Sequence, residues 1–141
     1  MPQTTIAAFD STIQTTNVWL HDIMDSLDWV DKHRAYHALG AVLHALRDRL
    51  PVEGAAALAA QLPLLIRGLF FEGWHPAGKP VKERKKEDFL AHVAAAFPGD
   101  PADPEEVARA VLAVLANHVS AGEVARVESL LPREIRSLLW N

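Results

Sequence analysis

LPLLIRGLFF, at residues 62–71, returns 69 positions later as LPREIRSLLW, at residues 131–140. An offset of 70 also aligns Trp19 with Phe89. A self-match at a fixed period in apolar positions is typical of two copies of one supersecondary unit that bury their apolar faces together. We therefore predict a single helical domain over 1–141, with repeat one at about 4–73, a linker at 74–86 and repeat two at about 87–140.

The composition narrows the class of protein. A chain of 141 residues is long enough to bury one core, and the absence of cysteine excludes a disulfide framework, a thiol nucleophile and a thiolate metal site. The formal net charge of -4 argues against nucleic acid as a partner, because such surfaces depend on dense lysine and arginine patches. The sequence has neither a signal-peptide pattern nor about 20 consecutive apolar residues, so we expect a cytoplasmic protein without a membrane partner.

Apolar residues recur at spacings of three and four along most of the chain, which predicts an all-α fold of about eight helices. We expect the first helix to expose Ile6 and Phe9 at its start and the second to bury Tyr36. Gly68 in the fourth helix suggests close packing against a neighbour. The helices are expected at about 4–28, 31–50, 53–61, 63–73, 87–97 and 107–119, followed by one that starts at 120 and one that starts at 132.

Several helix ends carry recognisable stop and start signals. Asp31 and Asp103 precede apolar helical segments and are expected to cap them. Ser120 and Glu123 have the spacing of a capping box, in which each side chain binds the backbone amide of the other residue. Gly73 follows an apolar helix and is expected to end it in the left-handed conformation.

The paired Leu-Pro elements at 62–69 and 131–138 occur together with the linker FEGWHPAGKP at residues 71–80. Over about residues 14–140 the chain resembles the bacterial all-helical family catalogued as domain of unknown function 2267. The resemblance implies a duplicated helical domain with no established catalytic chemistry and no assigned cofactor. The chain departs from the family pattern at His75, and its second copy ends at Trp140 without the Gly-Trp-Pro extension of the first, so a function tied to the linker is present once.

The linker is the first candidate binding site. Trp74 offers a flat aromatic face, and His75 and Lys79 lie beside it, followed by several basic residues. An aromatic ring next to clustered cations can hold an anionic or nucleotide ligand. The alternative interpretation is a simple connector, in which the indole packs into the helical core and the lysines are solvated.

Arg67 and Arg136 occupy equivalent positions in the two Leu-Pro elements. They form a candidate pair that grips an anion or the carboxylate of a partner. The alternative is that each arginine pairs within its own repeat, with a nearby acid or with carbonyl groups at a helix end.

Histidines on the second predicted helix are a weaker candidate for metal binding. His33 and His37 are four residues apart and His44 follows on the same stripe, with Asp48 one turn beyond. A pair of histidines at this spacing can bind zinc, nickel or copper, although a metal site would need further ligands. The alternative is that these histidines lie on the surface or at a contact between chains.

Motifs of common enzyme classes are missing from the sequence. It contains no Gly-x-Ser-x-Gly, no His-Glu-x-x-His and no dinucleotide-binding glycine pattern, and Glu105 and Glu106 suit the first turn of a helix better than an acid–base pair. We therefore interpret the chain as a non-catalytic binding or regulatory module without a cofactor, which mediates protein interaction or self-association. The alternatives are a sensor of a small anion or nucleotide that uses residues 73–86 with Arg67 and Arg136, and an uncharacterised enzyme or metal-binding protein.

Overall fold

The computed structural model describes residues 6–97 and 102–139. Within these residues the chain is all-α and has no strand, which confirms the predicted fold class. Trp140 and the expected start of the first helix at residue 4 lie outside the described residues. The helices are α1 Ala7–Leu27, α2 Lys32–Arg47, α3 Val52–Ala59, α4 Leu64–Phe71, α5 Lys86–Ala94, α6 Pro104–His118, α7 Ala121–Leu130 and α8 Arg133–Arg136.

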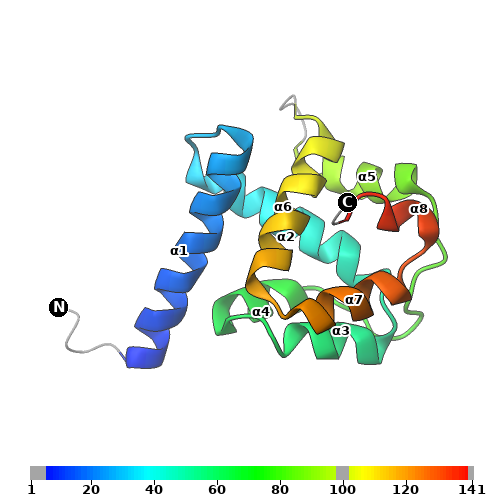
Figure 1. Ribbon diagram of the computed structural model, residues 1–141, viewed down its shortest axis with the longest axis horizontal. Coiled ribbons are helices and arrows are strands. Elements are labelled where there is room, and N and C mark those ends of the chain that lie inside the picture. Colours follow the sequence, from blue (N-terminus) through cyan, green and yellow to red (C-terminus); the bar gives the residue numbers. More distant parts are fainter. Residues whose placement is uncertain (1–5, 98–101, 140–141) are drawn as a thin grey trace.

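Helices α2 and α6 form the centre of the domain, where they cross (Figure 1). Both are apolar on several sides, so neighbours can cover them from more than one direction. α1 and α5 each pack against both central helices, and α3 packs on α7. α4 lies against α1 and α2, and α8 lies against α5. When α1–α4 are matched in order with α5–α8, many of these contacts have a counterpart. The contact of α1 with α6, for example, corresponds to that of α5 with α2.

Two contacts between the halves occupy positions that correspond in the sequence. The buried ring of Trp19 stacks on His118 with centroids 4.7 Å apart. The guanidinium of Arg49 lies over the buried ring of Phe89, 5.3 Å from its centroid. Trp19 and Phe89 are aligned at an offset of 70, and Arg49 and His118 at 69. An internal twofold arrangement would produce such a pair of contacts; the repeat itself stays a prediction.

The helix ends follow the predicted signals with one exception. The carboxylates of Asp31 and Asp103 each accept a hydrogen bond from the backbone amide two residues later. The hydroxyl of Ser120 accepts from the amide of Glu123 at 3.1 Å. The second half of the predicted capping box is wrong, because the amide of Ser120 donates instead to the side-chain oxygen of Gln61 on the neighbouring segment, at 2.8 Å.

The predictions for Ile6, Phe9 and Gly73 are confirmed. Ile6 and Phe9 are 60% and 49% exposed, and Gly73 follows α4 with a φ of 72°. The predictions for Tyr36 and Gly68 are wrong. Tyr36 is 45% exposed, and a Cβ built on Gly68 would meet no atom within 4 Å. Both errors have one cause, since α1, α2 and α4 diverge here and leave a hollow instead of closing on each other.

No helix in the part of the chain that the structure describes is long and apolar enough to cross a membrane.

Candidate functional site

Side chains from α1 and α2 hold both ends of α4. The first amides of a helix and its last carbonyls have no partners within the helix. At the start of α4, the amide of Leu65 donates to the hydroxyl of Thr12 on α1, at 2.9 Å. Near its end, the carbonyl of Leu69 lies 2.7 Å from Nε2 of His44 on α2. Because a carbonyl only accepts, this nitrogen carries the proton.

Arg47 on α2 completes the C-terminal cap of α4. Its guanidinium is buried and donates from Nη1 to the carbonyls of Phe70 at 2.9 Å and Glu72 at 2.7 Å. Asp48 accepts from Nε at 2.9 Å and balances the charge. Hydrogen bonds from a charged donor are stronger than those between neutral groups. α4 is therefore held in place on two neighbours, although it has only eight residues.

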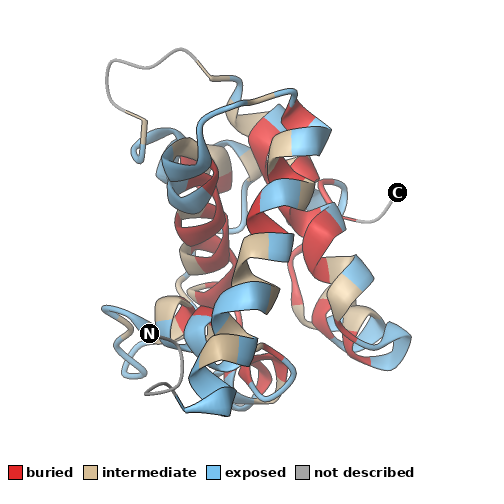
Figure 2. Cartoon of the chain, turned by 90° about the vertical axis from the view of Figure 1, so that its left-hand side faces the viewer, coloured by how far each residue is buried: buried red, intermediate tan, exposed pale blue. Residues whose placement is uncertain are grey.

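The space between α1, α2 and α4 is a groove of about 700 Å³. Figure 2 views the molecule from the side of α1, and much of the surface of this helix that faces the viewer is exposed or partly exposed. The groove is lined by Ile13, Thr16, Asn17, Leu20, Lys32, His33, Tyr36, Leu39, Leu65, Ile66, Gly68, Leu69 and Glu72. Seven of these residues are aliphatic or aromatic, Gly68 has no side chain, and the other five are polar, although most of the surface exposed in the groove is apolar. Concave, mainly apolar hollows of this size are the usual form of small-molecule and cofactor sites, and apolar grooves between helices also receive helical peptides.

The accessible walls of the groove come from three helices. Ile13 of α1, Tyr36 of α2 and Leu65 of α4 are each about half exposed. Gly68 widens the groove between them, because it places no side chain on the inner face of α4. The apolar surface continues along α1 through Phe9, one turn before Ile13.

The polar side chains at the groove include a contact between two helices. The ammonium of Lys32 lies 3.4 Å from the side-chain oxygen of Asn17, which links α2 to α1. Arg49 and Glu105 have shifted pKa values, but neither lines the groove. Burial lowers the pKa of the Arg49 guanidinium, while the nearby Glu83 carboxylate raises it.

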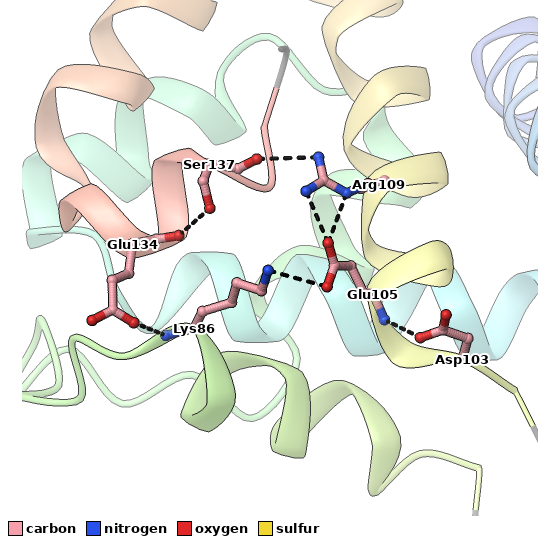
Figure 3. A network of polar contacts seen from close by, with 6 residues as sticks. All are labelled: Lys86, Asp103, Glu105, Arg109, Glu134 and Ser137. Atoms are coloured by element: carbon pink, nitrogen blue, oxygen red, sulfur yellow. Dashed lines mark hydrogen bonds and ion pairs between the residues drawn. The ribbon is translucent and has the colours of Figure 1, made fainter.

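Glu105 belongs to a polar network at the other side of the fold (Figure 3). Its carboxylate accepts hydrogen bonds from Arg109, at 2.9 and 3.1 Å, and pairs with Lys86 at 3.1 Å. These bonds hold the pKa of Glu105 below its ordinary value. The backbone amide of Lys86 donates to Glu134, and Arg109 donates to the carbonyl of Ser137. The network joins α5, α6 and α8, and Glu105 lies in the first turn of α6, where the sequence places it as helix-end charge.

The linker residues lie apart from the groove. Trp74 is half-buried against the core with its ring 5.1 Å from that of Phe71, as the connector interpretation expects. His75 is exposed and Lys79 is partly exposed. The linker is fastened to the end of α2, since Glu83 accepts from Arg49 at 2.6 Å.

The structure does not bring the two candidate arginines to one place. Arg67 on α4 donates to the carbonyls of Ala59 and Leu62 at the end of α3, both at 3.0 Å, which is the pairing with helix-end carbonyls considered above. Arg136 is exposed on α8, beside Arg133. Figure 1 shows α4 and α8 in different parts of the molecule. The groove is lined by none of the linker residues Trp74, His75 and Lys79, nor by either arginine.

The histidine stripe divides between two environments. His33 and His37 are exposed, and His33 lines the groove, whereas His44 is bound to α4. The ring of His37 lies 5.4 Å from that of Tyr36. In the ranges 6–97 and 102–139, no group of three or more His, Cys, Asp or Glu side chains is placed to hold a metal ion.

Sequence reasoning missed the groove, but one signal could have indicated it. α4 reads LLIRGLFF, which is apolar on nearly all sides in only eight residues. Such a short helix with few neighbours cannot bury every apolar side chain, and Leu64 and Leu65 are indeed 53% and 49% exposed. The roles of Thr12, His44 and Arg47 depend on contacts between helices, which sequence spacing alone does not reveal.

Comparison with known families adds a single finding. The sequence model of the family described as "Uncharacterized conserved protein (DUF2267)" matches residues 16–138. The chain belongs to this family. The DUF2267 match includes α2 and α4, which form two walls of the groove, and begins within α1, after the exposed residues Phe9 and Ile13. A search of functionally curated proteins finds no match to this DUF2267 chain.

Proposed function

We propose that this chain is a non-catalytic helical module that binds an apolar segment of a protein in the groove between α1, α2 and α4. The observation that carries the proposal is the groove itself, whose exposed walls are Ile13, Tyr36 and Leu65. An apolar groove between helices is the form in which many proteins receive an amphipathic helix. Here α4 is fixed at both ends before anything binds, so less conformational entropy is lost on binding.

The composition of the groove favours a protein segment over a charged small ligand. Its polar members lie among many apolar ones, and the candidate cations Arg67, Arg136 and Lys79 are elsewhere. Lys32 and His33 lie at the rim, but the exposed walls of the groove are mainly apolar, so the apolar side of a helix would lose water on contact with Leu65 and Ile13. A sensor of a small anion at the linker remains an alternative hypothesis. In the described residues, the linker side chains do not come together with Arg67 and Arg136 in one site.

Site-specific photocrosslinking tests the proposal. Tyr36 lines the groove and is 45% exposed, so replacing it with the photoreactive amino acid benzoylphenylalanine places the reactive group at the groove wall. Irradiation of cells that express this variant is expected to give a covalent adduct with a protein, identified by mass spectrometry. A second reactive group at Arg126, which is exposed on α7, provides the control.

Substitutions at Gly68 show whether the adduct depends on the groove. Gly68→Lys fills the groove with a long side chain, and Gly68→Ala adds a methyl group into open space at similar helix propensity. The adduct at position 36 should persist with G68A and be lost with G68K. The proposal is wrong if position 36 gives no protein adduct beyond that of position 126, or if G68K leaves the adduct unchanged.

A further inference from the structure

We infer that the protein segment received by the groove is the first half of α1 from a second copy of this chain, so that the module pairs with itself. The inference rests on the function proposed above and names its partner. It starts from the observation that the chain carries an exposed apolar helix face directly beside an apolar groove.

The first half of α1 has the form of a helix that docks in a groove. Ile6, Phe9 and Ile13 follow each other at spacings of three and four and therefore lie on one stripe. Their exposed fractions are 60%, 49% and 49%, while the buried residues of α1 begin only at Trp19. The sequence from residue 6 to residue 20 contains one ionisable side chain, Asp10. The stripe thus offers apolar surface with little charge to desolvate.

The stripe and the groove form one surface. Ile13 belongs to both, and the hydrogen bond between Thr12 and Leu65 places this part of α1 at the start of α4. A twofold axis beside α1 would set the stripe of each copy into the groove of the other, with the two α1 helices antiparallel. Such an interface uses the same patch on both chains, as most homodimers do.

The size of the patch agrees with a dimer interface. Each of its large apolar side chains is about half exposed and offers roughly 100 Å², so the patch exposes on the order of 600 Å² per chain. Contiguous apolar patches larger than a few hundred Å² are rare on monomers, and a standard interface buries about 800 Å² per partner. The side chains are Ile6, Phe9, Ile13, Tyr36, Leu64 and Leu65.

Charge at the edges of the patch also fits a second copy. The rim of the groove carries Lys32 and His33 at the start of α2. Asp10, the one ionisable residue of the incoming segment, follows Phe9 in the sequence, so the segment brings no positive charge to Lys32 and His33. Glu72 at the end of α4 also lines the groove, and the apolar stripe itself adds no negative charge beside it.

Sedimentation equilibrium on the purified full-length chain tests the inference. The wild-type chain and G68A should form a dimer, at twice the chain mass of 15.5 kDa, within concentrations up to about 500 µM. G68K, which blocks the groove, and Phe9→Asp, which places a charge in the stripe, should each weaken the dimer by at least about 30-fold. Both positions are exposed, so neither variant should lose its fold, which the far-UV circular dichroism spectrum verifies.

Val52→Asp is the matched control, because Val52 is an exposed apolar residue on α3 outside the groove. The inference is overturned if the wild-type chain stays monomeric, if G68K and F9D dimerise like wild type, or if V52D weakens the dimer as much as F9D does. Photocrosslinking at position 36 separates this failure from that of the proposed function. If the chain is monomeric but gives an adduct with another protein, only the inference that a second copy fills the groove is refuted. If the chain gives no protein adduct, the proposed protein-binding function is refuted as well.

Discussion

Replacing Arg47 with methionine tests whether the cap on α4 is as important as the geometry indicates. Methionine keeps most of the apolar volume of the side chain but cannot donate to the carbonyls of Phe70 and Glu72. It also leaves Asp48 without its ion pair to Arg47. Two carbonyls and one carboxylate thus lose a donor at a site where the arginine is only 5% exposed.

The expected loss of stability can be worked out from these contacts. A buried polar group left without its hydrogen bond costs about 1–3 kcal/mol, and removing one member of a buried charged pair costs about 3–5 kcal/mol. Because Glu72 is exposed and water can reach part of the site, we expect Arg47→Met to lower the free energy of unfolding by about 3–5 kcal/mol. At this chain length that corresponds to a melting temperature lower by about 10–15 °C.

Urea denaturation followed by circular dichroism at 222 nm measures the effect. Arg47→Lys keeps the charge but lacks the forked donor group, so its loss should lie between wild type and R47M. Arg126→Met on the exposed face of α7 should change stability by less than about 0.5 kcal/mol. A loss below about 1 kcal/mol for R47M would show that the carbonyls at the end of α4 do not depend on Arg47, and the reasoning would be refuted.

Three further predictions follow from other contacts. Gly68→Ala should raise the free energy of unfolding by about 1 kcal/mol through helix propensity, because the added methyl group meets no atom. Gly54→Ala should gain less, since its Cβ would lie 2.7 Å from a methyl group of Leu130, which must move aside; a gain in urea as large as that of G68A would contradict this. Glu105→Gln should lower the melting temperature near pH 7, because the pKa of Glu105 in the folded protein lies below its ordinary value of 4.5. The extra stability of wild type is complete above pH 4.5 and should be lost as the pH falls through the folded pKa. A difference in melting temperature that does not shrink on acidification would be the contrary result. Arg49→Met removes the ion pair with Glu83 and should speed trypsin cleavage at Lys82, Arg84 and Lys85 in the native protein, while an unchanged rate would mean that Arg49 does not hold the linker.

Sequence patterns predicted the helices well because the signals are local. Asp31, Asp103 and Ser120 cap helices where their spacing from the apolar segments places them, and Gly73 ends α4 with a positive φ. These features depend on the backbone of a few neighbouring residues. The apolar periodicity likewise predicted helices at 31–50 and 107–119, where α2 and α6 lie.

The candidate site was harder to predict because it depends on how helices diverge. Tyr36 follows the apolar spacing of α2 and was expected in the core, yet α4 does not close over it. Gly68 was expected to allow close packing, but it faces open space. Periodicity identifies which side of a helix is apolar; it does not show whether a neighbour covers that side. For Arg67 the sequence left two interpretations open, and the hydrogen bonds to carbonyls at the end of α3 are contacts that spacing alone does not reveal.

Footprinting of the groove inside cells is the most direct test of the claim that this surface binds a protein. Side chains are labelled with photogenerated carbene, once in cells and once with the purified chain at high dilution, and the labelled residues are quantified by mass spectrometry. The groove residues Ile13, Tyr36 and Leu65 should label less in cells than in the diluted chain, while Val52 on α3 should label equally in both. Equal labelling of the groove residues in both samples would contradict the claim, whichever protein was proposed to cover them.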